Sequence, residues 1–135
     1  MSTEPVVTGF HHAAVQTTDY EGTKRFYMDV LGCRMANEWE GGDRHLCLLD
    51  LGDGGCIEVI GVPEAQRPTE ATAQYPMIHL ALRTNDVDAA IARVRAAGCE
   101  VTIEPKDAVL GEMTVRLAFF VGPNGEILEL FHPKG

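Results

Sequence analysis

The stretch HHAAVQTTD, residues 11–19, reappears in altered form as IHLALRTND, residues 78–86. In both copies a histidine precedes an aspartate by seven residues: His12 precedes Asp19, and His79 precedes Asp86. The two histidines are 67 positions apart in a chain of 135 residues. Self-similarity at a nearly fixed offset is the sequence sign of a repeated structural unit. This pair of stretches therefore predicts a fold made of two half-length copies.

Further landmarks recur in the same order downstream of each histidine. An expected helix ends in Gly-Cys in both copies, at residues 32–33 and 98–99, an offset of 66. Each copy then closes on a glycine-containing turn followed by a short apolar strand with one glutamate. These strands are GGCIEVI with Glu58 and NGEILELF with Glu129, an offset of 71. Four landmarks in one order are difficult to obtain by chance in so short a chain.

Each copy has the pattern of a βαβββ module, which makes the predicted fold class α+β. We expect one module in residues 1–61, a second in residues 76–135, and a linker at 62–75. The first strand of each copy alternates with period two, and apolar residues at helical spacing follow it. The aspartate that follows the first strand, or the residue just before it, is placed to cap each helix.

Strand alternation also assigns the histidines to a face. In the second copy Ile78, Leu80 and Leu82 form an apolar face, so His79 points to the opposite side. The same alternation places His12 on the corresponding side of the first copy. The clearest remaining strands are predicted at residues 45–51, 56–60, 114–121 and 127–132.

The residues at matched places in the two copies are His12, Glu58, His79 and Glu129. Two imidazoles and two carboxylates form a mixed nitrogen and oxygen set that suits Zn, Ni, Fe, Mn or Co, with open positions for water or substrate. A carboxylate on an apolar strand is costly to bury unless a positive charge pairs with it, and a cation would supply that charge. Taken singly, each of the four could instead be a structural strand residue. We expect His11 to be structural, facing the apolar side or the start of the strand.

Composition narrows the possible partners. The chain carries 11 basic and 20 acidic residues, a formal net charge of −9, which disfavours binding to nucleic acid or anionic membranes. The N-terminal residues lack the features of a secretory signal, and no apolar run is long enough to span a membrane. The four cysteines have no CxxC spacing, which favours reduced thiols and a cytoplasmic location.

Three stretches resemble the vicinal oxygen chelate superfamily, which includes glyoxalase I, bleomycin-resistance proteins and extradiol dioxygenases. They are HHAAVQTTDYEGTKRFYMDVLGC, IHLALRTNDVDAAIARVRAAGC and FFVGPNGEILELF, and the resemblance runs from about residue 9 to residue 133. It implies paired βαβββ modules that form a curved, incomplete barrel around a divalent metal. The implied ligands are His12, Glu58, His79 and Glu129. The resemblance also implies a homodimer with sites at the subunit interface.

The complete His-Glu-His-Glu set looks most like bacterial glyoxalase I. That likeness implies a lyase or isomerase that moves a proton on a small substrate chelated through two oxygens, with Glu129 as base and Glu58 as its counterpart. Alternatives are a ferrous extradiol-type dioxygenase and a non-enzymatic drug-binding protein of the bleomycin-resistance type. Arg83 and Arg116 are candidate contacts for an anionic group of the substrate.

Overall fold

The computed structural model of the protein describes residues 10–67, 69 and 79–134. The elements of module 1 are β1 (His12–Thr17), α1 (Tyr20–Arg25), a π-helical turn η1 (Phe26–Val30), β2 (Arg34–Gly41), β3 (Arg44–Asp50) and β4 (Cys56–Gly61). Those of module 2 are β5 (Leu80–Arg83), α2 (Val87–Ala96), β6 (Val101–Leu110), β7 (Met113–Val121) and β8 (Ile127–Lys134). The α+β class with two βαβββ modules is thus confirmed.

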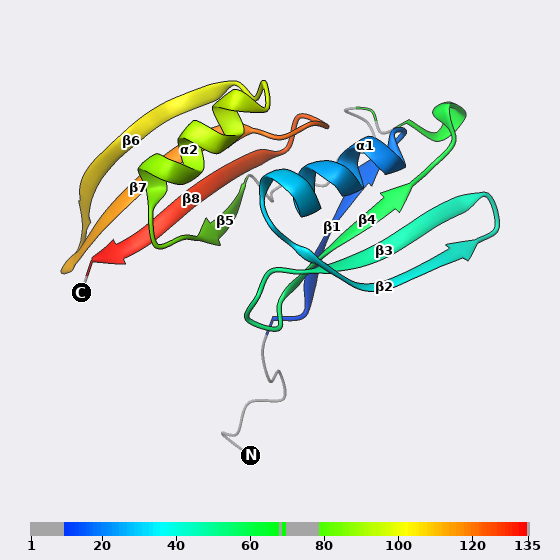
Figure 1. Ribbon diagram of the computed structural model, residues 1–135, viewed down its shortest axis with the longest axis horizontal. Helices are drawn as coiled ribbons and strands as arrows, with labels where there is room; N and C mark the ends of the chain where they lie inside the picture. The colour runs from blue at the N-terminus through cyan, green and yellow to red at the C-terminus, as the bar shows by residue number, and fades with distance from the viewer. Residues whose placement is uncertain (1–9, 68, 70–78, 135) are drawn as a thin grey trace, which may run out of the picture.

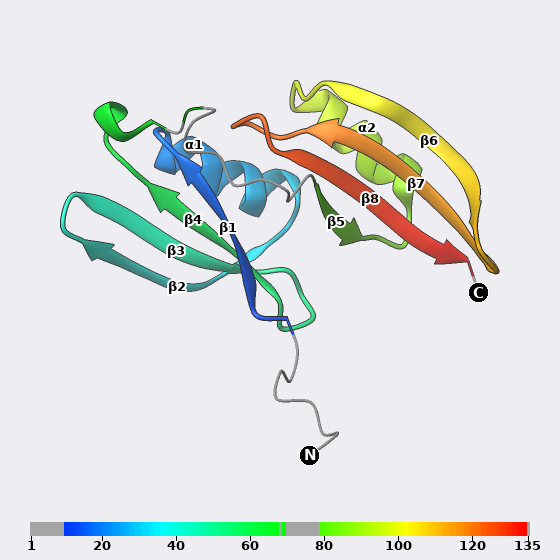
Figure 2. The same ribbon diagram turned by 180° about the vertical axis from the view of Figure 1, so that it is seen from behind.

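Each module forms its own four-stranded sheet, ordered β1-β4-β3-β2 in module 1 and β5-β8-β7-β6 in module 2. The first and last strands of a module pair in parallel, and the other neighbours are antiparallel. The two sheets lie side by side, with both helices on the same side of them (Figure 1; Figure 2 shows the reverse). Within the part of the chain that the structure describes, the opposite face of each sheet carries no helix. This topology places β1 and β4, or β5 and β8, next to each other in each module.

The helices begin and end where the repeated residues predict. Of the two cap candidates in each copy, the aspartate caps the helix: Asp19 and Asp86 each accept the backbone N–H three residues later at 3.0 Å. Gly32 and Gly98, which follow the helices, have φ values of 81° and 91°. Glycine adopts this left-handed conformation without a steric penalty, so it ends a helix readily.

The β6–β7 hairpin explains why the offset between copies changes from 66 to 71. Strands β6 and β7 have 10 and 9 residues, whereas β2 and β3 have 8 and 7. Glu100 adds one more residue between the Gly-Cys landmark and β6. The additional residues therefore lie within the hairpin and its entry, and they leave the paired first and last strands unchanged.

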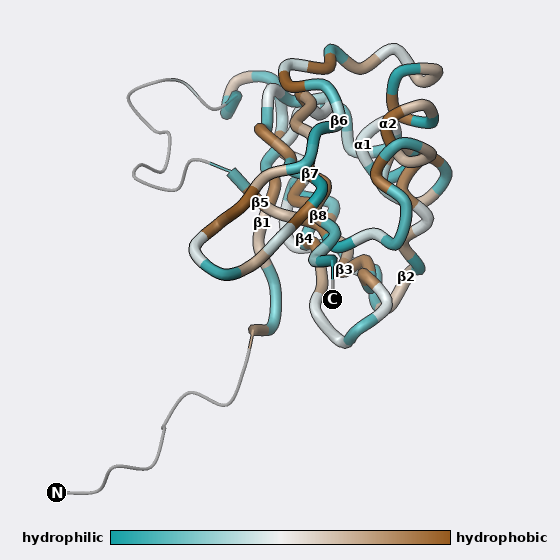
Figure 3. The backbone as a smooth tube through the Cα atoms, turned by 90° about the vertical axis from the view of Figure 1, so that its left-hand side faces the viewer, coloured by the Kyte–Doolittle hydropathy of each residue, from teal (hydrophilic) through white to brown (hydrophobic). Residues whose placement is uncertain are grey.

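One hydrophobic core joins the two modules. Ile57 and Val59 of β4 and Leu128 and Leu130 of β8 are buried in the same cluster of side chains. Apolar stretches of the chain run along the strands beside polar loops (Figure 3). Since the buried residues of β4 and β8 alternate with the two glutamates, the core and the glutamates occupy opposite faces of each sheet.

Little of the expected linker at 62–75 can be compared with the structure. A short 3₁₀ helix, Glu64–Gln66, follows β4. Residues 68 and 70–75 of the linker lie outside the described residues. Among the described residues, no helix is long and apolar enough to cross a membrane.

Candidate functional site

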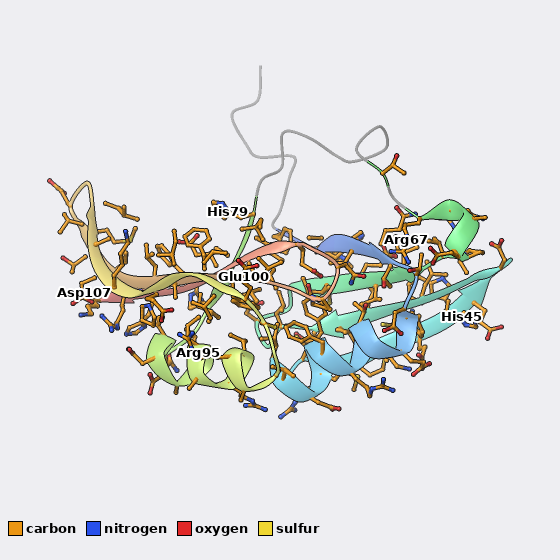
Figure 4. The ribbon with its side chains drawn as sticks, turned by 90° about the horizontal axis from the view of Figure 1, so that it is seen from above. His45, Arg67, His79, Arg95, Glu100 and Asp107 are labelled. Atoms are coloured by element: carbon orange, nitrogen blue, oxygen red, sulfur yellow. The ribbon has the colours of Figure 1, made fainter. Side chains whose placement is uncertain are left out.

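The four predicted ligands lie on the sheet faces that the helices leave open. Burial alternates along β1, where His12 is exposed and Thr17 is buried, and along β5, where Ala81 and Arg83 are exposed. Figure 4 shows His79 on the sheet side of the molecule and Arg95 on the helix side. The expectation that both histidines face away from the core agrees with this arrangement.

The first half-site, defined as His12 and Glu58, is formed by the parallel pair β1 and β4. Glu58 pairs with Ala14 in the register of the two strands. His12 is two residues before Ala14 on the same face, so its side chain lies close to the Glu58 carboxylate. The distance from His12 Nε2 to Glu58 Oε1 is 3.6 Å, and the two side chains are 39% and 17% exposed.

The second half-site, defined as His79 and Glu129, has the same arrangement on β5 and β8. The distance from His79 Nε2 to Glu129 Oε1 is 3.3 Å, and the two side chains are 36% and 9% exposed. Phe119 of β7 lies opposite Glu129 and meets the imidazole of His79 edge-on, with ring centroids 5.3 Å apart. The second half-site is therefore more enclosed and has an aromatic wall.

The donor atoms of each half-site fit two ligands of one divalent ion. Nitrogen and oxygen atoms bound to such an ion at about 2.1 Å, with a tetrahedral angle between them, are roughly 3.4 Å apart. The observed separations of 3.6 Å and 3.3 Å bracket this value. Glu129 is only 7% exposed, and a buried carboxylate needs a positive partner, which a cation next to His79 would provide.

One chain does not bring the four residues to a common point. Within residues 10–67, 69 and 79–134, no three His, Cys, Asp or Glu side chains are close enough together to hold a metal ion. The structure therefore assembles the predicted set as two separate His–Glu pairs, one in each module. Each pair presents one nitrogen and one oxygen donor atom.

His11 lies at the start of the first strand, which is one of the two positions expected for it. It is exposed, and its Nδ1 lies 2.8 Å from Nδ1 of His12. The two rings meet edge-on with centroids 5.1 Å apart. His11 thus lies outside the apolar face and contacts Nδ1 of His12, the ring nitrogen that does not face Glu58. A contact of this kind helps to fix the orientation of a ligand histidine.

Thiols contribute little to the chemistry of these faces. Cys56 shares the face of Glu58 by strand parity, but burial, followed by the nearby Asp50 and Asp53, raises the pKa of its thiol. Burial raises the pKa of Cys33 to about 11. A neutral thiol is a poor metal ligand and nucleophile. All four cysteines are free, in agreement with the expected reduced state.

The two candidate arginines lie in different surroundings. Arg83 is exposed at the end of β5, on the His79 face by parity, and pairs in register with Phe131. Arg116 donates from Nε to Asp88 at 2.6 Å and from Nη1 to Asp107 at 3.2 Å, which holds it against α2 on the helix side. The structure therefore places Arg83 four residues beyond His79, where it lines a cavity between the modules, and brings Arg116 to neither half-site.

Phe119 is the site residue that the sequence interpretation missed. Strand alternation in β7 could have indicated it. Phe119 and Arg116 are three residues apart, so their side chains lie on opposite faces of the sheet. The register that sets Phe119 opposite Glu129 could not be derived from one strand alone. A cavity of about 750 Å³ between the modules lies elsewhere, and none of the four predicted ligands lines it.

Comparison with known proteins identifies the family. Residues 9–130 match the family described as "Glyoxalase/Bleomycin resistance protein/Dioxygenase superfamily", and the chain belongs to it. The chain is 33% identical over 127 residues to "Uncharacterized protein YaeR" of Escherichia coli, covering 90% of this chain and 93% of that protein. It is 27% identical over 125 residues to a "Probable lactoylglutathione lyase" of Vibrio parahaemolyticus, covering 91% of this chain and 89% of the relative.

Solved structures show the same fold. The trypanothione-dependent glyoxalase I of Leishmania major superposes with a TM-score of 0.73 at 21% identity, covering 93% of this chain and 87% of that chain. TnmS3, an antibiotic-binding protein from Streptomyces sp. CB03234, superposes with a TM-score of 0.71 at 24% identity, covering 97% and 100%. One fold thus serves an enzyme and a binding protein, so function must be argued from the site.

Proposed function

We propose that this protein is a metal-dependent lyase or isomerase of the glyoxalase I type, acting on a small substrate that chelates through two oxygens. The observation that carries the proposal is the pair of matched half-sites, with nitrogen-to-oxygen distances of 3.6 Å and 3.3 Å. A drug-binding protein without a metal has no need for a nearly buried glutamate beside a histidine in each module. The relationship to a probable lactoylglutathione lyase also supports the proposal.

The four ligands would be His12, Glu58, His79 and Glu129, holding Ni, Zn, Fe, Mn or Co. A divalent ion in this position supplies stabilisation of negative charge that develops on a substrate oxygen. Glu129 acts as the base, because its carboxylate is the more enclosed of the two and can take a proton from a substrate carbon and return it to the neighbouring carbon. Glu58 is its counterpart in the other half-site.

The complete site is formed in a homodimer in this proposal. Each chain supplies two half-sites that do not meet within the described part of the chain, so module 1 of one copy must pair with module 2 of another. The helix-free faces also carry exposed apolar side chains, including Trp39 at 36%, Ile103 at 38% and Ile127 at 39%. A partner module laid over these faces would bury them.

The substrate surroundings are apolar next to the ligands. Leu48 lies opposite Glu58, and Phe119 lies opposite Glu129. Arg83 stands at the strand end beyond Glu129, where it can meet an anionic group of the substrate. These contacts favour a small, partly apolar substrate with its polar atoms directed at the metal.

Metal analysis tests the proposal most directly. Protein purified without added metal is examined for bound metal and titrated with Ni²⁺, Zn²⁺, Co²⁺, Mn²⁺ and Fe²⁺, next to Glu129→Gln. We expect one ion per complete site, which equals one ion per chain in a dimer, and weaker binding by the variant. Failure of the wild-type protein to bind any of these ions would overturn the proposal.

Turnover then separates enzyme classes that share the site. Methylglyoxal is supplied with glutathione, with bacillithiol or without a thiol, and oxygen uptake is followed with catechols under ferrous iron. Isomerisation of the methylglyoxal adduct is the expected result. Oxygen uptake would support a dioxygenase instead, and tight binding of a cationic drug without turnover would support a binding protein of the bleomycin-resistance type.

A further inference from the structure

A set of hydrogen bonds connects module 1 to the turn between β7 and β8. Tyr27 donates from its hydroxyl to Glu126 Oε2 at 2.9 Å, across 99 positions of sequence. Asn124 donates from Nδ2 to Thr23 Oγ1 at 2.9 Å, across 101 positions. We call these four residues the cross-module latch. Thr23 and Tyr27 come from α1 and η1, whereas Asn124 and Glu126 come from the turn that leads into β8.

The latch continues to the strand that bears a predicted ligand. The Thr23 hydroxyl donates to Thr17 Oγ1 at 3.0 Å, and Thr17 is the last residue of β1, the strand of His12. On the other side, Glu126 is followed directly by β8, the strand of Glu129. The hydrogen bonds thus connect a strand of the first half-site to a strand of the second half-site.

The partners in the latch are held firmly. Tyr27 is fully buried, and burial next to the Glu126 carboxylate raises the pKa of its hydroxyl, so it remains a donor. The second carboxylate oxygen of Glu126 accepts the backbone N–H of Asn124 at 2.6 Å. Gly122 leaves the space that Glu126 occupies, because a Cβ there would lie 2.5 Å from Glu126 Cδ.

The π-helical turn η1 adapts module 1 to this contact. Phe26 and Tyr27 are neighbours in sequence, yet both are buried. Phe26 packs toward Phe120 of module 2 with ring centroids 6.4 Å apart, while Tyr27 reaches Glu126. Widened turns of this kind are rare in helices and frequent at functional positions. Here the turn directs two adjacent aromatic side chains at module 2.

The matched contact on the other side of the repeat is made to a backbone oxygen, because Arg93 of α2 donates from Nη2 to the carbonyl oxygen of Asp29 at 2.9 Å. The residue that corresponds to Asn124 at the offset of 71 is Asp53, whose Oδ1 accepts only the local Gly55 N–H among the hydrogen bonds of the described residues. The position of Glu126 is taken by Gly55. The 750 Å³ cavity lies between this turn and α2. Arg93, which lines it, is the residue of module 2 that corresponds to Tyr27 at the offset of 66. Among the described residues, hydrogen bonds between side chains therefore close one junction, whereas a bond from the Arg93 side chain to the backbone of Asp29 spans the other.

We propose that Asn124 and Glu126 are positioning residues, which fix the orientation of module 2 relative to module 1 so that both half-sites of a chain can be completed at once by a second copy. This inference rests on the proposed shared metal site. In a symmetric dimer each chain contributes module 1 to one site and module 2 to the other. An error in the angle between the modules of one chain therefore displaces ligands in both sites.

The test compares Glu126→Ala and Asn124→Ala with Asp53→Ala. Asp53 is the matched control, because among the described residues its side chain accepts a hydrogen bond from Gly55 in the same turn and none from the other module. Glu126→Gln is the conservative variant, because it keeps an acceptor for Tyr27. Residual dipolar couplings of backbone amides report the orientation of the modules, and competition with a chromophoric chelator reports Zn²⁺ and Ni²⁺ affinity. The melting temperature of each variant is measured first, so that the dipolar couplings and metal affinities are compared at a temperature at which all variants are folded.

We expect Glu126→Ala and Asn124→Ala to change the angle between the modules and to weaken metal binding by about 10- to 100-fold. Asp53→Ala should keep the wild-type angle and affinity, and Glu126→Gln should recover most of the affinity. A lower melting temperature with unchanged angle and affinity would overturn the inference, since it would show a stabilising role alone. If wild-type protein binds no metal, the proposed function fails, whereas the dipolar couplings still decide whether the latch fixes the modules.

Discussion

The two modules place a histidine and a glutamate in the same way but surround them differently. In module 1 the Glu58 side chain is 17% exposed and Leu48 lies opposite it, whereas in module 2 the Glu129 side chain is 9% exposed and Phe119 lies opposite it. The strand pairing that sets the ligand geometry is common to both. A duplicated framework can therefore keep the positions of the His–Glu pair while the neighbouring strand places a different side chain beside it.

The largest difference is expected between the two glutamates. Glu129→Gln should lower turnover of the methylglyoxal adduct by about 10²- to 10⁴-fold, the usual contribution of a positioned base. Glu58→Gln should lower it less, because this carboxylate is the more open one. Turnover is compared at metal concentrations that saturate each variant. Equal losses in the two variants would show that the half-sites are functionally equivalent.

The cores of the modules provide a second comparison, at the buried positions Phe120 and Leu49, which are 71 residues apart. Phe120→Ala should cost about 3–5 kcal/mol of unfolding free energy and Leu49→Ala about 2–5 kcal/mol. Phe120 also faces Phe26 across the module boundary, so we expect its loss to be the greater one. Urea unfolding monitored by circular dichroism measures both. A greater loss of unfolding free energy for Leu49→Ala would show that the core position in module 1 contributes more to stability than its counterpart in module 2.

The matched thiols Cys33 and Cys99 should differ in reactivity. Burial raises the pKa of both, to about 11 for Cys33, which is buried, while Cys99 is only half-buried. Because the thiolate reacts and the thiol does not, alkylation should accelerate as the pH rises, by roughly tenfold per pH unit below the pKa. Mass spectrometry of protein treated with iodoacetamide at pH 8 should find Cys99 modified first. Preferential modification of Cys33 would contradict the burial seen in module 1.

A smaller change is expected at the wall of the second half-site. Phe119→Leu makes this wall resemble that of module 1 and removes the edge-on contact with His79. The loss should be about 0.5–1.5 kcal/mol of unfolding free energy, the usual worth of an aromatic pair. Leu48→Ile is the control, since it retains an aliphatic side chain at the matched position. The His79 ring signals in NMR spectra should shift only in the Phe119 variant.

The smallest effect is expected for Arg116→Ala. This arginine is bound to Asp88 and Asp107 at the surface of the helix side, and exposed ion pairs contribute little to stability. Metal affinity should remain at the wild-type level, whereas Arg83→Ala should raise KM for an anionic substrate. A loss of metal affinity in Arg116→Ala would mean that the helix side influences the half-sites.

Much of the fold could be predicted from the sequence because local signals repeat. Strand parity placed His12 and His79 on the face away from the core, and Asp19 and Asp86 are cap residues in both copies. The change of offset reflects the longer β6–β7 hairpin. These features depend on residues close together in the chain, where periodicity and capping chemistry act.

The arrangement of the site depended on tertiary placement that these signals do not contain. The residues alone predicted four ligands without deciding whether one chain or two bring them together, because the distance between modules is not a local property, and a single chain forms two pairs. Contacts such as Tyr27 to Glu126 likewise join residues 99 positions apart. The sequence left two positions open for His11, the apolar side or the start of the strand, because strand parity does not apply to a residue that precedes β1.

The extended β6–β7 hairpin has a consequence for the behaviour of the protein in concentrated solution. Its end exposes Val109 at 72%, Leu110 at 46% and Met113 at 42% on a chain with a net charge of −9. Mutual repulsion keeps such ends apart near neutral pH, but it vanishes near the isoelectric point of about 4.9. Precipitation on mild acidification should therefore begin at this hairpin, and Val109→Lys should extend the range of pH in which the protein stays dispersed.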